Sequence, residues 1–176
     1  MKTQPDGISQ AVGFFSKEKM SWDNNNLACI LIFPPWQKLG LGQILMGTSY
    51  ELSQGEGRVG GPEKPLSELG RKSYLRFWQA RVAAAILALR NKSSIEVSEL
   101  SVKCSMATED VITTLKAMGV CEVSKQNDSL SVSKSRVQGW SAKNGLDLKP
   151  PVSGDGFLPV DDSSADEEDD EEFGSD

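Results

Sequence analysis

The stretch LACILIFPPWQKLGLG, residues 27–42, constrains the fold of this chain more than any other part of it. Residues 27–33 are apolar or small and carry no charge, which predicts one buried strand. The prolines at 34–35 end it, because proline cannot donate a hydrogen bond to a sheet and restricts the residue before it. A glycine loop over 37–42 precedes a helical pattern over 43–53. This order of elements can cradle phosphate groups, because glycines allow close backbone approach and helix N-terminal amides attract anions.

The glycine loop has the form Gln-x-x-Gly-x-Gly, from Gln37 to Gly42. It does not fit GxGxxG, because Ile44 and Leu45 stand where the third glycine would be needed, and no Gly-Lys-Ser/Thr occurs in it. The pattern is that of the diphosphate loop in acetyl-coenzyme A enzymes. A plain connection between a strand and a helix would carry the same glycines, so the loop alone leaves both interpretations open.

The wider sequence around the loop is more specific. The blocks are VGFFSKEK (12–19), NLACILIFPPWQKLGLG (26–42), SYELS (49–53), GGPEKPLSELG (60–70) and YLRFW (74–78). In order and spacing they resemble the MYST family of histone acetyltransferases. The resemblance implies an α+β fold with a partial GNAT-like acetyl-CoA-binding core, and the transfer of acetyl from acetyl-CoA to a lysine ε-amine. It also implies a nuclear protein that regulates chromatin and transcription.

Two residues become catalytic candidates through this resemblance, Glu63 as general base and Cys29 as an active-site cysteine. A carboxylate deprotonates a lysine ammonium well only if partial burial raises its pKa. The competing interpretation of Glu63 is an exposed loop acid paired with Lys64, and a cysteine in a strand is ordinarily a small buried hydrophobe. We favour direct attack by lysine assisted by Glu63, while acetylation of Cys29 during turnover stays open.

The cofactor residues also follow from the resemblance. They are Ile30, Ile32, Gln37, Lys38, Leu39, Gly40, Leu41, Gly42, Gln43 and Ser67. The strand backbone at Ile30 and Ile32 would pair with the pantetheine amides, and the loop would take the diphosphate on its own amides. Lys38 adds a point charge where many relatives carry arginine. The later cofactor serine of the family falls at Arg76, so that contact is not carried over.

Other patterns organise the rest of the core, residues 1–92. Residues 11–15 and 27–33 predict the two strands of a β-hairpin. The helix over 43–53 places Ile44, Leu45, Thr48 and Leu52 on one face. A second helix over 71–90 carries a core stripe of Tyr74, Trp78, Val82, Ala85 and Leu89.

Residues 93–149 predict a winged-helix-like part. Helices are expected over 95–104 and 108–118, followed by a hairpin of 120–123 and 129–132 with its turn at Asn127-Asp128. Thr108 and Asp110 are expected to cap the second helix, and Gly119 to end it. That helix, TEDVITTLKAM, has two acids and one lysine, so we expect it to pack against the core and expect no direct sequence-specific DNA binding.

Residues 150–176 predict a disordered linker and acidic tail. Positions 161–176 hold ten of the 25 acids, which leaves 19 basic and 15 acidic residues elsewhere, a net charge of +4. Such a tail cannot bury apolar surface. It serves either to keep the protein soluble or to compete for basic histone segments.

The cysteines bound the chemistry further. Cys29, Cys104 and Cys121 form no close pair, and the chain has no histidine. We therefore expect no zinc site, no disulfide framework and an intracellular protein. No apolar stretch is long enough to cross a membrane, and MKTQPDGISQ lacks the apolar core of a secretory signal.

The resemblance covers only the C-terminal part of a MYST catalytic domain. The family's zinc finger and first strands are expected to be missing, which predicts weak cofactor binding and little turnover in isolation. The segments FPPWQ and GLGQILMG resemble those of a fungal, silencing-type branch of the family. Expected partners are histone tails, nucleosomes and a chromatin-modifying complex. The alternatives are an inactive chromatin module that acts through the winged helix and acidic tail, and a small-molecule acetyltransferase, which would share only the glycine loop.

Overall fold

The computed structural model describes residues 2–3, 7, 9–90, 92, 94–123 and 130–157, which form a mixed α/β chain. Its helices are α1 (Leu41–Gly55), α2 (Glu68–Leu87), α3 (Val97–Cys104), α4 (Thr108–Met118) and α5 (Lys134–Asn144), with 3-10 turns η1 (Pro34–Trp36) and η2 (Gly154–Gly156). Its strands are β1 (Lys2–Thr3), β2 (Ser9–Gln10), β3 (Gly13–Phe15), β4 (Asn25–Leu27), β5 (Ile30–Ile32), β6 (Gly61–Pro62), β7 (Ser94–Glu96), β8 (Cys121–Val123) and β9 (Leu130–Ser133). These strands form four small sheets, in the orders β1-β2, β3-β5, β4-β6 and β7-β9-β8.

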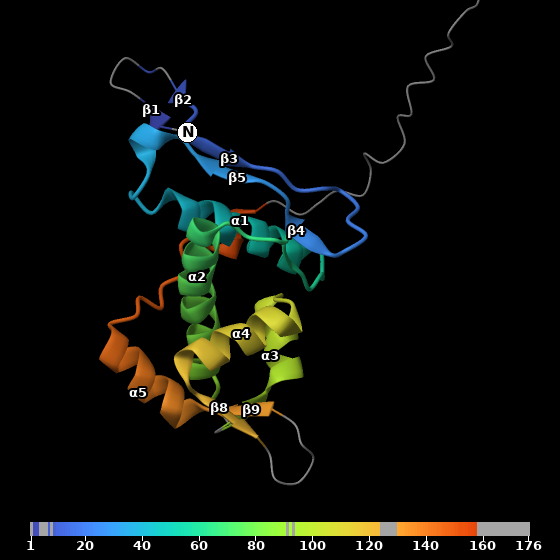
Figure 1. Cartoon of the computed structure of the whole chain (residues 1–176), viewed down its shortest axis with the longest axis vertical. Helices are drawn as coiled ribbons and strands as arrows, with labels where there is room; N and C mark the ends of the chain where they lie inside the picture. Colours follow the sequence, from blue (N-terminus) through green and yellow to red (C-terminus); the bar gives the residue numbers. More distant parts are fainter. Residues whose placement is uncertain are drawn as a thin grey trace, which may run out of the picture.

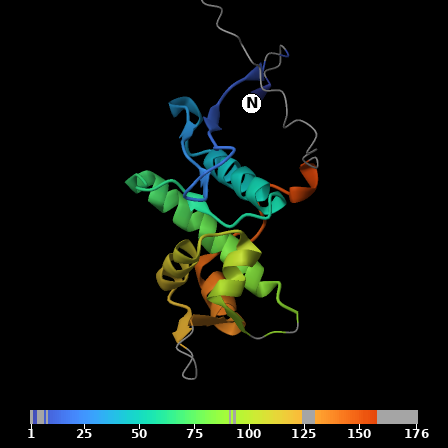
Figure 2. The same cartoon turned by 90° about the vertical axis from the view of Figure 1, so that its right-hand side faces the viewer.

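Helix α2 is the central helix, against which the other helices pack. In Figure 1, α1 and the first strands lie at one end of α2, and α3, α4, α5, β8 and β9 lie toward the other, while Figure 2 shows that α2 is inclined to the long axis of the molecule. It contacts α1, α3, α4 and α5. The helix predicted over 71–90 is confirmed, and it begins three residues earlier because the Ser67 hydroxyl caps the N–H of Gly70.

The hydrophobic core surrounds α2. Of the predicted stripe, Tyr74, Trp78 and Val82 are fully buried, while Ala85 and Leu89 are half-buried. The Trp78 Nε1–H donates to the Tyr50 hydroxyl of α1 at 2.8 Å. Because this bond satisfies a buried polar group, the two helices can pack closely without leaving the indole N–H unpaired.

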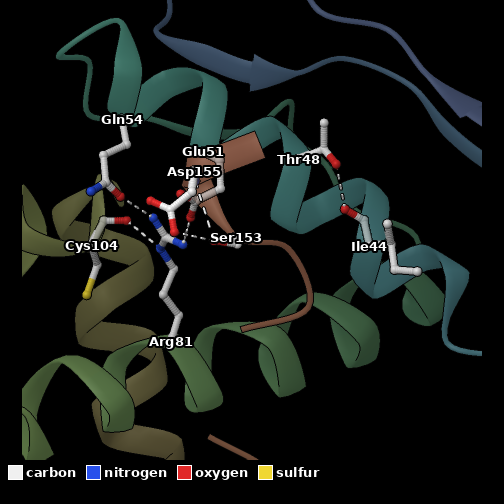
Figure 3. A network of polar contacts seen from close by, with 8 residues as sticks. All are labelled: Ile44, Thr48, Glu51, Gln54, Arg81, Cys104, Ser153 and Asp155. Carbon is white, nitrogen blue, oxygen red and sulfur yellow. Dashed lines mark hydrogen bonds and ion pairs between the residues drawn. The ribbon is translucent and has the colours of Figure 1, made fainter. Parts of the chain in front are cut away.

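An arginine joins three helices beside this core. Figure 3 shows Arg81 of α2 reaching toward α1 and the end of α3. Its guanidinium donates to Glu51 Oε1 at 2.8 Å, to Gln54 Oε1 at 2.9 Å and to the Cys104 carbonyl at 2.8 Å. The fork geometry of arginine thus links α1, α2 and α3 through one largely buried side chain.

The buried face of α1 differs from the expected grouping. Ile44, which the sequence placed with Leu45, Thr48 and Leu52, is 43% exposed. The structure buries Met46, Gly47, Ser49, Tyr50 and Ser53 instead. The reason is the packing of α1 on α2 through Tyr50, which turns the more polar stripe inward.

The region 94–144 contains two of the predicted helices and the predicted hairpin. Helix α4 has the predicted bounds and ends at Gly119, which has a φ of 68°. The strands β8 and β9 pair antiparallel, and the predicted turn at Asn127-Asp128 lies outside the described residues. Helix α5 was not predicted.

Two details of this region correct the sequence analysis. The helix expected from Ile95 begins at Val97, because Ile95 pairs with Val132 and forms the third strand of the sheet. The expected cap by Thr108 and Asp110 is wrong, since Ala107 is the N-cap residue and no side chain caps the helix.

The segment after α5 returns to α1. A Cβ at Gly47 would lie 2.9 Å from Pro151, so the chain packs against α1 there. The end of the predicted linker and the acidic tail, 158–176, lie outside the described residues. Within the described part of the chain, no helix is both long and apolar enough to cross a membrane.

Candidate functional site

The predicted strand over 27–33 is divided in two. Its first part, β4, pairs in parallel with β6, whereas β5 pairs antiparallel with β3, which confirms the hairpin. Between them, the Ala28 N–H donates to the Ser16 carbonyl and the Ser16 N–H donates to the Cys29 carbonyl, both at 2.9 Å. Two residues thus face one, the arrangement of a β-bulge. The prediction of one buried strand is therefore wrong, because the chain changes its pairing partner here.

The bulge changes the environment of Cys29. Its backbone N–H donates to the Ser16 hydroxyl at 3.1 Å, and its thiol is free and exposed. The alternative of a small buried hydrophobe is excluded. The side chain is available at the surface, where a bulge commonly re-aims a residue.

The backbone of β5 has an open edge. The Phe33 N–H donates to the Val12 carbonyl at 3.0 Å, and the Leu31–Phe14 pair lies in the same ladder. Antiparallel pairing alternates the direction of the backbone groups, so Ile30 and Ile32 direct theirs to the opposite edge. None of the described strands pairs there.

The glycine loop leads from β5 into α1. The Gln37 side chain donates to the Ile32 carbonyl at 3.0 Å and so fixes the start of the loop. Gly40 is the N-cap residue of α1, with a φ of 80°, and no side chain caps the helix. Lys38 also has a positive φ, 62°. Because α1 begins with backbone amides that lack a side-chain cap, its N-terminus can accept an anion.

Two further candidates of the cofactor site have structural partners. The Gln43 side chain donates to the Ser73 carbonyl at 3.1 Å and ties α1 to α2. The Ser67 hydroxyl accepts from the Gly70 N–H at 3.0 Å as the cap of α2. Leu39 and Lys38 are exposed, and Leu41 and Gly42 are half-buried in the first turn of α1.

Glu63 follows β6 and lies beside the strand that leads to Cys29. Its backbone N–H donates to the Leu27 carbonyl at 2.9 Å, two residues before Cys29. The Glu63 side chain is exposed, so it lacks the partial burial that the sequence argument required. The competing ion pair with Lys64 is not formed either, because the Lys64 ammonium binds Asp110.

The two glycines before Glu63 are needed for close packing. A Cβ at Gly60 would lie 2.1 Å from the Asn24 carbonyl, and one at Gly61 would lie 2.3 Å from Asp110 Oδ2. The Gly60 carbonyl also accepts from the Ala107 N–H at 2.8 Å. The loop is therefore held between β4 on one side and the start of α4 on the other.

Asp110 is the charged group that the sequence analysis misassigned. Its Oδ1 lies 2.8 Å from Lys64 Nζ, and its side chain is 4% exposed. Burial raises the pKa of Asp110, and the hydrogen bond from Lys64 opposes that shift. A signal was present in the sequence, since Asp110 falls on the same face of α4 as Thr114 and next to Val111, which are both buried.

The other cysteines are separate from this site. Cys104 is buried at the end of α3, and burial raises the pKa of its thiol to about 11. Burial likewise raises the pKa of Cys121. Both thiols therefore stay protonated at neutral pH, which argues against either as a nucleophile. No cluster of three or more metal-binding side chains occurs in the part of the chain that the structure describes.

A cleft of about 530 Å³ adjoins the glycine loop through Gln43. It lies between α2 and the segment 146–151, and Arg76, Arg81 and Lys149 contribute to its wall. Arg81 is paired with Glu51, whereas Arg76 and Lys149 form no ion pair with any described residue. The sequence analysis did not predict this basic cleft.

Comparison with known proteins gives a consistent picture. A model described as the MOZ/SAS family matches residues 1–152. The chain is 40% identical over 137 residues to histone acetyltransferase MOF of Drosophila melanogaster, covering 78% of this chain and 16% of that protein. It is 46% identical over 114 residues both to putative MYST-like histone acetyltransferase 1 of Oryza sativa and to histone acetyltransferase mst1 of Schizosaccharomyces pombe. These matches cover 65% of this chain and 25% and 24% of the two relatives, so the chain spans about a quarter or less of their length.

Proposed function

This chain belongs to the MOZ/SAS family, and on that premise we propose that it binds acetyl-CoA and transfers the acetyl group to a lysine ε-amine of a histone. One observation carries the proposal. The pairing of β4 with β6 brings Glu63 beside the bulge at Cys29, and the open edge of β5 leads from there into the uncapped start of α1. This arrangement supports the proposal, because the candidate base, the open strand edge and the candidate anion site follow one another along the chain's surface.

Acetyl-CoA suits this path from end to end. The backbone groups of Ile30 and Ile32 would pair with the pantetheine amides along the edge of β5, where the Ile32 carbonyl already accepts from the Gln37 side chain and would have to share or exchange that bond. The loop from Gln37 to Gln43, with Lys38, would take the diphosphate on its amides. The basic cleft beyond Gln43 offers Arg76 and Lys149 to the remaining phosphate of the nucleotide.

The reaction needs a free amine. The pKa of a lysine ε-ammonium is about 10.4 in model peptides, so it must lose a proton before it attacks. Glu63 would accept this proton, the amine would form a C–N bond to the thioester carbonyl, and the C–S bond would break. The departing thiolate would take up the second proton that the nitrogen loses as the amide forms, so that coenzyme A leaves as the free thiol. Substrate binding would supply the partial burial that Glu63 lacks in the free protein. Cys29 lies at the same site, and its role as an acetyl carrier is not required for this route.

The two regions of the fold take different parts in this proposal. We assign the elements from β3 to α1, with β6, to a GNAT-like acetyl-CoA-binding core within residues 1–92. We assign α3, α4 and the sheet β7-β9-β8 to a winged-helix-like part within 93–149. Its second helix, α4, buries the face that carries Val111, Leu115 and Met118, which supports packing rather than DNA recognition. Histone tails and a chromatin complex are the proposed partners, in the nucleus.

The test is a pair of matched substitutions. Titration calorimetry should show that acetyl-CoA binds both the unchanged chain and Glu63→Gln with similar affinity. Turnover on a histone peptide should fall in Glu63→Gln by about 10²-fold or more, the usual contribution of a general base. Glu68→Gln is the control, because Glu68 is an exposed acid in α2 paired with Lys72. Equal activity in Glu63→Gln and the control would contradict the role of Glu63, and absence of acetyl-CoA binding would contradict the proposed function.

A further inference from the structure

The sequence places a cation directly beside the proposed base. Lys64 follows Glu63 in an exposed loop, where adjacent opposite charges can pair. A pair with Lys64 would stabilise the ionised carboxylate and so make it a weaker base. It would also occupy the oxygen atoms that must face the substrate ammonium. A base at this position therefore needs a device that keeps its neighbour away.

The structure contains such a device on α4. The Lys64 ammonium lies 2.8 Å from Asp110 Oδ1 and 3.8 Å from Glu109 Oε2, while Glu63 forms no ion pair among the described residues. The Asp110 side chain is 4% exposed, whereas that of Lys64 is 48% exposed. The lysine thus reaches from the loop to a carboxylate that is fixed in the interior.

The backbone holds the two partners in register. Gly61 approaches Asp110 so closely that a Cβ there would lie 2.3 Å from Oδ2. The Gly60 carbonyl accepts from the Ala107 N–H, three residues before Asp110. Since the loop and the start of α4 are bonded to each other, the ion pair does not depend on chance encounters of two surface side chains.

We propose that Asp110 is a positioning residue that holds the Lys64 ammonium away from Glu63 and so keeps the Glu63 carboxylate free to accept the substrate proton. The inference rests on the proposed function of Glu63. Burial of the Asp110 carboxylate costs free energy, and the contact with the Lys64 ammonium offsets part of that cost. The groups that face Asp110 are Lys64, Glu109 on its own helix, and the phenols of Tyr50 and Tyr74.

Turnover in three variants tests this directly. In Asp110→Asn, Lys64 is released to pair with Glu63. The kcat should then fall about two- to fivefold, because an exposed ion pair of ordinary strength would hold Glu63 in the paired state for the corresponding share of the time. The KM for acetyl-CoA should not change, because the glycine loop is untouched. In the double variant Asp110→Asn with Lys64→Met, the competing cation is gone and kcat should return to within about twofold of the unchanged chain, since the remaining substitutions are neutral in charge.

Glu109→Gln is the matched control. It removes the same charge one residue away, from a side chain that is 88% exposed and 3.8 Å from Lys64, and it should leave kcat unchanged. If the double variant is no more active than Asp110→Asn, Asp110 merely supports the fold of the loop and the inference is overturned. Unchanged kcat in Asp110→Asn overturns it as well.

A measurement on the unchanged chain covers the case in which Asp110→Asn does not fold or no turnover is seen. The ¹⁵Nζ signal of Lys64, assigned by its loss in Lys64→Arg, should follow the titration of the Asp110 carboxyl carbon. A Lys64 signal that follows the Glu63 carboxyl instead would overturn the inference. Because this readout needs no substrate, it separates the inference from the failure of the proposed function, which Glu63→Gln tests.

Discussion

The region before α2 and the region from α2 onward divide the work of the molecule. The proposed base, Cys29 and the proposed cofactor residues of β5, the glycine loop and Ser67 lie before α2, whereas Arg76 and Lys149 of the basic cleft lie from α2 onward. Most of the buried cluster lies from Tyr74 onward, and only Met46 and Tyr50 of α1 join it from the earlier region. The large exposed apolar side chains show the reverse distribution, with Phe14, Trp22 and Leu31 among those before α2.

This difference shows how the proposed site is held. The strands and loops that carry it have little core of their own, so they depend on a few tethers to the helices. The tethers are the bonds of the Gly60 loop to α4, the Lys64–Asp110 pair and the Arg81 network. The helical region thus supports the strands and loops that carry the proposed site.

The largest expected effect sharpens this contrast through stability. Leu115→Ala empties a fully buried position of α4 and should lower the free energy of unfolding by about 2–5 kcal/mol. Leu31→Ala removes a side chain that is 45% exposed on β5 and should cost no more than about 0.5 kcal/mol. Urea unfolding followed by circular dichroism measures both. Equal losses of unfolding free energy would mean that the packing of the region before α2 contributes as much to stability as that of the helical region.

The next effect tests the tether between the regions. Gly61→Ala forces a methyl group against Asp110 and should lower the free energy of unfolding by about 1–3 kcal/mol, as overpacking does. Gly55→Ala at the end of α1 is the control, because a Cβ there meets no atom within 4 Å. Thermal melts of the two variants compare them. If the two variants have the same melting temperature, the close contact of the loop with α4 does not contribute to stability.

A third substitution separates binding from stability within the early region. Gly42→Ala lies in the first turn of α1, where an added Cβ meets nothing within 4 Å, so it should leave stability unchanged or raise it by about 0.4–1 kcal/mol. If the loop amides hold the diphosphate, the methyl group should still weaken acetyl-CoA binding about tenfold or more, the effect of losing one hydrogen bond to a charged group. Calorimetry and melts of the same sample give both values. Unchanged affinity would place the diphosphate elsewhere.

The sequence predicted the helical region better than the early one. The periodic apolar residues of α2 and the glycine at 119 define local structure, because the helix period and the αL stop act within a few residues. The run over 27–33 misled because its apolar character indicates a strand but not which strand pairs with it. The change of partner at Ala28 and Cys29 depends on residues 13–16 and 61–62, which lie far away in the sequence.

The candidate site shows the same limit. Motif matching selected Glu63 and the glycine loop, and their catalytic and cofactor-binding roles stay predictions. The helix period indicates that Asp110 is buried, but its ion pair with Lys64 could not be predicted from local rules, because an acid at the start of a helix ordinarily indicates a cap. Lys64 becomes the partner of Asp110 because the loop at Gly61 packs against α4. These residues are far apart in the sequence, so no local pattern predicts the contact.

The smallest expected effect concerns pH and the same carboxylate. Burial raises the pKa of Asp110 above its ordinary value of 3.8, so the folded chain binds more protons than the unfolded chain between those two pKa values. The contribution of Asp110 to stability is therefore most favourable below 3.8 and falls as the pH rises through its folded pKa. Asp110→Asn lacks this titration, so the stability of the unchanged chain relative to that variant should improve on acidification from neutral pH, by at most about 1.4 kcal/mol per pKa unit of the shift.

Urea unfolding at a series of pH values measures that difference, with Gly55→Ala as a variant that removes no titrating group and should run parallel to the unchanged chain. If the unchanged chain instead loses stability relative to Asp110→Asn on acidification, the Lys64 ammonium outweighs burial and holds the Asp110 carboxylate ionised. The tether between the two regions would then be stronger than its burial implies, because breaking it by protonation would cost the early region its attachment to α4.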